Sequence, residues 1–184
     1  MCARQGGDED AALSLAADAG PAHAALAALA GSAGEEAVLL VMTADHRIVD
    51  AAAFRAAVAT GLAAADAGQL VTFGVVPTAP ETGYGYIRHQ LEPLPSPAGS
   101  KKHKTAFFKA EQFVEKPPLE KAVEYVNAGN YRWNAGMFIW SFVTVTNGLE
   151  KHQPEMHAAC QRWFAAAAKG KLNAVLKKEY PVIK

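Results

Sequence analysis

Three short, largely apolar runs stand out along the chain, at residues 38–42, 70–76 and 137–142. None of them alternates strictly between apolar and polar positions. Such runs are typical of strands that are covered on both faces, as in a sheet with helices packed on each side. We therefore expect these three segments to be central strands, with nearly all of their apolar side chains buried.

A helical pattern lies between the first two runs. Phe54, Val58 and Leu62 recur every four residues, which gives one apolar stripe, and Asp50 stands where an N-cap is needed. The helix is expected to continue to about Ala65. A strand, a helix and a strand in this order, with short joins, predict a right-handed crossover with parallel strands.

Other segments complete the expected domain. Residues 1–10 are polar and expected to be loose. Gly83 and Gly85 lie among aromatics and are typical of a tight turn, and residues 91–104 indicate a loop or wide hairpin because they hold three prolines, a glycine and a lysine-rich run. The further elements are an alanine-rich helix over 11–33, a strand over 105–114, a helix from Pro117 to Gly129, and helices after Asn147 broken at Pro154 and near Gly170. The sum predicts an α/β three-layer domain over 11–184, with a mixed, mostly parallel sheet.

Composition narrows the class of protein. Of 184 residues, 51% are hydrophobic and 20% charged, which is ordinary for a globular domain, and 18 basic residues balance 18 acidic ones. No net field is available to attract nucleic acid or an anionic membrane, and the run at 101–104 lacks interleaved aromatics. The two cysteines form no CxxC pair, and no apolar stretch approaches membrane length, so we expect a cytoplasmic protein. A homo-oligomer is left open.

The strongest candidate chemistry lies at the end of the strand that reaches residue 114. Glu115 and Lys116 follow apolar residues, and Pro117 then prevents further strand pairing. The carboxylate can accept hydrogen bonds from sugar hydroxyls, and the ammonium can neutralise a phosphate. A solvated strand end would give the same local sequence.

Three other positions offer related chemistry, each with a plainer alternative. Asp45 directly follows a buried-type strand, where it can hold Mg²⁺ or simply form a turn. Gly85 has no Cβ, so a sugar ring could lie against its backbone, and Tyr84 could cover that ring or merely pack. Asn134 can both donate to and accept from a vicinal diol, although asparagine is also common in turns.

Four segments that include these residues occur in one order. They read VLLVMTADH at 38–46, LVTFGVVPT at 70–78 running into PETGYGYI at 80–87, FVEKP at 113–117, and YRWNAGMF at 131–138. Together they resemble the sugar-nucleotide pyrophosphorylases, specifically the bacterial long-chain mannose-1-phosphate guanylyltransferases. The resemblance covers somewhat over half of the chain.

The resemblance implies a Rossmann-like nucleotidyltransferase fold and a set of roles. Tyr84 and Gly85 would face the hexose, and Glu115 and Asn134 would hold its hydroxyls. Lys116 would bind the 1-phosphate, and Asp45 would bind the catalytic Mg²⁺, so that Asp45 and Lys116 are the expected catalytic residues. The implied reaction transfers GMP from GTP to mannose 1-phosphate, giving GDP-mannose and pyrophosphate without a covalent intermediate.

Some family features are missing from the sequence. Thr43 and Ala135 replace the usual proline and serine, and no glycine-rich loop with its arginine and lysine precedes the first expected strand. We therefore expect a domain incomplete at both ends that turns over weakly, whether as a natural truncation, a gene fragment or a degenerate paralogue. A non-catalytic sugar-phosphate-binding or regulatory domain, and a pyrophosphorylase for another hexose 1-phosphate, stay open as alternatives.

Overall fold

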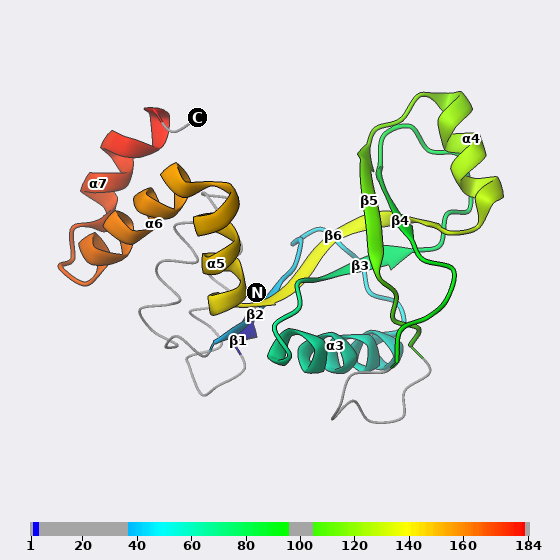
Figure 1. The fold of residues 1–184 in the computed structure, drawn as a ribbon, viewed down its shortest axis with the longest axis horizontal. Helices are drawn as coiled ribbons and strands as arrows, with labels where there is room; N and C mark the ends of the chain where they lie inside the picture. The colour runs from blue at the N-terminus through cyan, green and yellow to red at the C-terminus, as the bar shows by residue number, and fades with distance from the viewer. Residues whose placement is uncertain (1, 4–36, 96–104, 183–184) are drawn as a thin grey trace. The chain divides into compact units, whose positions relative to one another are not determined.

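The computed structural model describes residues 2–3, 37–95 and 105–182, and Figure 1 shows its elements. The strands are β1 (Cys2–Ala3), β2 (Val38–Val41), β3 (Val71–Val75), β4 (Gly85–His89), β5 (Ala110–Glu115) and β6 (Tyr131–Ser141). The helices are α3 (Ala51–Asp66), α4 (Leu119–Ala128), α5 (Phe142–His152), α6 (Pro154–Ala167) and α7 (Leu172–Glu179), followed by the 3₁₀ turn η1 (Tyr180–Val182). The expected helix over 11–33, the lysine-rich run and most of the segment 1–10 lie outside the described residues. The mixture of strands and helices is that of an α/β fold.

The described strands pair in the order β1-β2-β6-β4-β5, and β3 also pairs with β6. The β1–β2, β4–β5 and β4–β6 pairs are antiparallel, so the expectation of a mostly parallel sheet is wrong for them. A continuous apolar run indicates that a strand is covered, but it does not set the direction of its neighbours. The sequence also does not predict β4, because glycines and aromatics around residue 85 predict a turn. That strand lies between β6 and β5 and runs antiparallel to both.

The chain divides into two compact units. The first comprises Met1–His46, Ala65–Leu70 and Ile139–Lys184, and the second comprises Arg47–Ala64 and Val71–Phe138. Within the described residues, no helix combines the length and the apolar character that crossing a bilayer requires.

In the first unit, β2 is buried as expected. Val38, Leu39 and Leu40 are all buried, as is Ile139 near the end of β6. The strand expected to reach residue 142 ends one residue earlier, because Ser141 caps α5: its side chain accepts a hydrogen bond from the backbone N–H of Thr144 at 3.1 Å.

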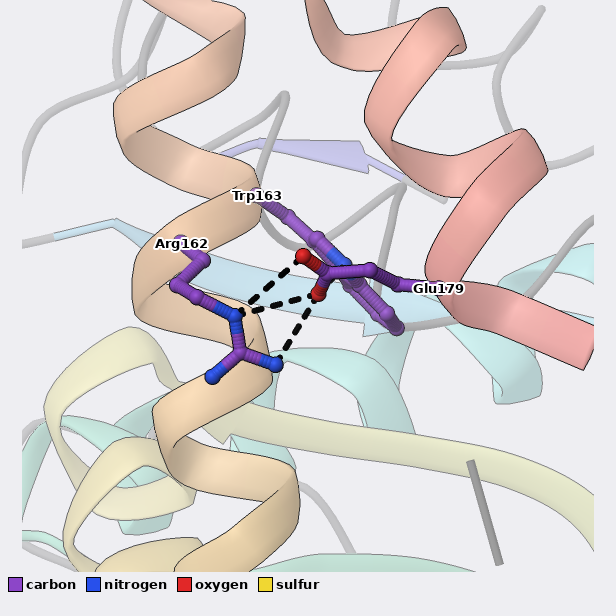
Figure 2. Close-up of polar contacts among 3 residues, drawn as sticks. All are labelled: Arg162, Trp163 and Glu179. Carbon is purple, nitrogen blue, oxygen red and sulfur yellow. Dashed lines mark hydrogen bonds and ion pairs between the residues drawn. The ribbon is translucent and has the colours of Figure 1, made fainter. Parts of the chain in front are cut away.

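Helices α6 and α7 of this unit are joined around one tryptophan (Figure 2). Trp163 is fully buried and packs with Ala159, Cys160 and residues of α7. Its indole nitrogen donates to Oε2 of Glu179 at 3.2 Å, and Arg162 binds the same carboxylate through Nε at 3.1 Å and Nη2 at 2.9 Å. The carboxylate thereby satisfies the polar edge of a buried aromatic side chain.

In the second unit, the predicted start of α3 and the predicted end of α4 are confirmed, whereas α4 begins at Leu119 rather than at Pro117. The Asp50 carboxylate caps α3 by accepting from the backbone N–H groups of Ala52 and Ala53, at 3.1 and 2.9 Å. Helix α4 ends at Gly129, whose φ of 74° is the left-handed conformation that favours glycine at this position. It packs through Ala122 against Tyr86 and its neighbours in the sheet.

Two strand predictions in this unit need correction. The segment 70–76 is not central, because among the described strands β3 pairs with β6 alone, and Val75 is 49% exposed. Strand β6 begins at Tyr131 rather than residue 137, so Asn134 lies inside a strand. The strand expected over 105–114 is shorter and displaced, at Ala110–Glu115.

Candidate sugar-phosphate site

Three of the predicted site residues meet at one end of the sheet in the second unit. Gly85, the first residue of β4, pairs with Glu115, the last residue of β5. On the other side of β4, Tyr86 pairs with Trp133 of β6, and Asn134 is the next residue along. A Cβ built on Gly85 would lie 2.7 Å from Oε2 of Glu115 and 3.5 Å from Cβ of Asn134. The Glu115 carboxylate and the Asn134 side chain therefore lie on the same face of the sheet, above the bare backbone of Gly85.

The missing side chain at Gly85 is what leaves room between its neighbours. Any residue with a Cβ would bring that carbon against the Glu115 carboxylate. Glu115 itself is open to solvent, with 70% of its side chain exposed. A carboxylate presented in this way is an acceptor for hydroxyl groups of a ligand.

Lys116 follows with an unusual backbone. Its φ of 45° makes it the one non-glycine residue with positive φ among the described residues. Its backbone N–H donates to the carbonyl of Tyr84 at 3.1 Å, which holds the end of β5 to the segment entering β4. Its Nζ lies 3.9 Å from Oε1 of Glu115, and 67% of the side chain is exposed. An ion pair this long and exposed adds little stability, so the ammonium is available to a ligand.

Tyr84 borders the same group of residues. It is 50% exposed, and its ring meets Trp133 edge to face, with centroids 5.1 Å apart and an interplanar angle of 78°. The hydroxyl of buried Tyr86 donates to the carbonyl of Glu81 at 2.8 Å, which anchors the segment before β4. A half-exposed aromatic ring beside polar groups is suited to packing against a sugar ring.

Asn134 is held more firmly than the other site residues. Its Oδ1 accepts from the backbone N–H of Gly136 at 3.1 Å and from the hydroxyl of Thr72 at 3.3 Å. Sequence reasoning missed Thr72, because a threonine within an apolar strand carries no signal of contact with a distant asparagine. The Asn134-Ala135-Gly136 spacing did carry a signal, since asparagine side chains commonly bond the backbone two residues ahead.

Asp45 belongs to the first unit, whereas Tyr84, Gly85, Glu115, Lys116 and Asn134 belong to the second. It is exposed in a turn just after β2. Its convergence with the sugar-side residues stays a prediction. Within residues 37–95 and 105–182, no three His, Cys, Asp or Glu side chains gather in a metal-binding group.

Comparison with known proteins shows which family the chain resembles. A sequence model described as Nucleotidyl transferase matches residues 7–180. A mannose-1-phosphate guanylyltransferase of Escherichia coli strain K12 is 44% identical over 79% of this chain, which is 29% of that protein. The xanthan biosynthesis protein XanB of Xanthomonas campestris pv. campestris strain B100 is 46% identical over 77% of this chain and 28% of its own length. The chain thus spans less than a third of these curated relatives.

Two solved structures are also similar to this chain. The crystal structure of mannose-1-phosphate geranyltransferase from Thermus thermophilus is similar with a TM-score of 0.65 and 37% identity, over 84% of this chain and 42% of that one. That of mannose-6-phosphate isomerase from Helicobacter pylori gives 0.63 and 31%, over 78% and 50%. With a family match that covers nearly the whole sequence and two structures of the same fold, the chain belongs to the nucleotidyl transferase family.

Proposed function

We propose that this chain supplies the sugar-phosphate side of a guanylyltransferase that transfers GMP from GTP to mannose 1-phosphate. The carrying observation is the group of Gly85, Glu115 and Asn134 on one face of the sheet, with Lys116 directly beside it. The names of the similar proteins support mannose 1-phosphate as the sugar.

Each residue has a role that follows from its position. The Glu115 carboxylate accepts hydrogen bonds from hydroxyls of the hexose, and the bare backbone of Gly85 lets the ring approach. Tyr84 offers a half-exposed aromatic ring for packing against the hexose. Lys116 places its ammonium on the 1-phosphate as a point charge.

The chemistry is an in-line displacement. An oxygen of the sugar phosphate attacks the α-phosphorus of GTP, the bond from that phosphorus to the bridging oxygen breaks, and pyrophosphate leaves with the electron pair. Such a reaction needs alignment of the two substrates and neutralisation of charge. Lys116 contributes to both, because it fixes and neutralises the attacking phosphate.

Mg²⁺ is the expected cofactor, and Asp45 is the residue proposed to hold it. An exposed carboxylate in a turn fits this hard ion, which binds through one or two carboxylates and completes its shell with water and substrate phosphates. Bound there, the ion would neutralise charge on the nucleotide phosphates. A cytoplasmic location is proposed with the same reaction, because the composition carries no sign of an oxidising compartment.

Calorimetric titration tests the sugar-phosphate site. We expect wild-type chain to bind mannose 1-phosphate, and Lys116→Ala to weaken that binding by about tenfold, the loss of one hydrogen bond to a charged group. Unphosphorylated mannose should bind Lys116→Ala and wild type alike. Lys121→Ala is the matched control, since it removes an exposed lysine of α4 whose partner is Glu124. Equal binding of mannose 1-phosphate by wild type and Lys116→Ala would contradict the phosphate role.

Turnover is measured separately. The purified chain is incubated with GTP, mannose 1-phosphate and Mg²⁺, and pyrophosphate release is followed. We expect binding with little or no turnover, because the sequence lacks the glycine-rich loop, and losing even one preorganised donor costs roughly 10² to 10³ in rate. Robust turnover would show that the loop is dispensable.

A further inference from the structure

The side-chain amide of Asn134 has a defined orientation. Its Oδ1 lies 3.1 Å from the backbone nitrogen of Gly136. A backbone N–H can only donate, so the atom that faces it must be the amide oxygen rather than the amide nitrogen. The Nδ2 group is therefore turned away from Gly136, and it makes no hydrogen bond to any residue that the structure describes.

Two features of the chain create this arrangement. Gly136 has a φ of 66°, a conformation that favours glycine, and its N–H donates to the side chain two residues earlier. Thr72 of β3 reaches the same oxygen from the neighbouring strand, with its hydroxyl 3.3 Å from Oδ1 of Asn134 and 3.2 Å from the carbonyl of Met137. Both acceptors within reach of the single hydroxyl proton belong to β6.

We propose that Thr72 is a positioning residue of the sugar-phosphate site, which with the Gly136 N–H holds the Asn134 amide so that it acts as a hydrogen-bond donor to the ligand. This inference rests on the proposed function. Glu115, on the other side of Gly85, can only accept when ionised. The two side chains thus form an acceptor and a donor on either side of one bare backbone position, which matches a pair of hexose hydroxyls of which one donates and one accepts.

Calorimetric titration of mannose 1-phosphate tests the positioning role. Thr72→Val, which replaces the hydroxyl by a methyl group, should raise the Kd about three- to tenfold, the range expected for one hydrogen bond. Thr72→Ser keeps a hydroxyl and should bind nearly as wild type does. The matched control is Thr60→Val in α3, since the Thr60 hydroxyl bonds the carbonyl of Ala56 in its own helix and should not affect the Kd.

A double-mutant cycle separates positioning from a general structural effect. In an Asn134→Ala background, Thr72→Val should add no further loss of affinity, because its effect acts through the amide that is already absent. Asn134→Asp keeps an oxygen for both donors but removes the Nδ2 donor, so it should lose about tenfold or more in affinity. Additive losses, or wild-type affinity in Asn134→Asp, would overturn the proposal.

A measurement without ligand keeps this inference distinct from the proposed function. In NMR spectra of the free chain, Thr72→Val should shift the side-chain amide resonances of Asn134, and Thr60→Val should leave them unchanged. Unchanged Asn134 resonances in Thr72→Val would overturn the positioning role. A wild-type chain that binds no mannose 1-phosphate would instead contradict the proposed function, and with it the ligand that the amide is proposed to meet.

Discussion

Gly85 and Glu115 face each other across the β4–β5 pair, and a Cβ on Gly85 would come within 2.7 Å of Oε2 of Glu115. The nearest atom is the far end of a flexible, exposed side chain, so the carboxylate can rotate away while the strands stay in place. The absence of a side chain at residue 85 therefore determines where the carboxylate of residue 115 can rest. The relationship couples a backbone position to the carboxylate that is proposed to bind the hexose.

Gly85→Ala should consequently weaken sugar-phosphate binding with little effect on folding. We expect the free energy of unfolding to change by less than about 1 kcal/mol, as for an ordinary surface substitution, while the Kd for mannose 1-phosphate rises. Gly83→Ala is the matched control, because a Cβ there meets no atom within 4 Å. Urea unfolding and calorimetry give the two quantities, and an unchanged Kd in Gly85→Ala would remove the link between this glycine and the site.

The backbone of Lys116 allows its charge and its conformation to be tested separately. A left-handed non-glycine residue costs roughly 1–2 kcal/mol, and glycine relieves this at an entropic cost of about 0.5–1 kcal/mol. Lys116→Gly should therefore be up to about 1.5 kcal/mol more stable than Lys116→Ala in urea unfolding. Both lack the ammonium and should bind mannose 1-phosphate equally weakly. A less stable glycine variant would show that this φ carries no strain in the folded chain.

The residues of the candidate site could be predicted from the sequence, but the contacts that support them could not. Glu115, Lys116 and Asn134 were identified because carboxylate, ammonium and amide groups are the residue types that bind sugars and phosphates, and family resemblance linked them. Gly85 was identified as a place for close approach, and the structure adds the neighbour that requires it. Thr72 could not be found in this way, because its contact with Asn134 depends on the pairing of β3 with β6.

In the fold, likewise, the helix boundaries could be predicted from the sequence, but the pairing of the strands could not. Local signals set the boundaries of α3 and α4, since the Asp50 carboxylate and the left-handed Gly129 act within a few residues of each helix. Strand direction and exposure depend on which strands pair, and an apolar run does not encode its neighbours. This is why β4 went unrecognised and β3 was expected to be central.

Gly74 is predicted to be required for the approach of β3 to β6. A Cβ on Gly74 would lie 2.6 Å from Cβ and 3.0 Å from Cγ of Arg132. The Arg132 Cβ cannot rotate away, because it is bonded directly to the backbone. Gly74→Ala should therefore destabilise the chain by about 1–3 kcal/mol, the usual cost of overpacking.

Gly148→Ala is the contrasting control. Gly148 lies within α5, and a Cβ there would meet no atom within 4 Å, so the substitution should stabilise the chain by about 0.5–1 kcal/mol. Equal stabilities of Gly74→Ala and wild type in urea unfolding would contradict the close approach.

The contact between α6 and α7 should weaken in acid. Hydrogen bonding and charge from Arg162, together with the bond from Trp163, hold the pKa of Glu179 below its usual range, although burial opposes this shift. A carboxyl with a lowered folded pKa stabilises the fold fully above the ordinary glutamate value of about 4.3, and that contribution is lost as the pH falls through the lower folded value.

Protonation of Glu179 removes the charge that accepts from Arg162 and from the indole of buried Trp163 (Figure 2). Wild type should therefore exceed Glu179→Gln in stability at pH 7, and the difference should shrink as the pH falls below the ordinary glutamate value of about 4.3, in thermal unfolding followed by tryptophan fluorescence. A difference that stays constant over that range would mean that ionisation of Glu179 does not hold the two helices together.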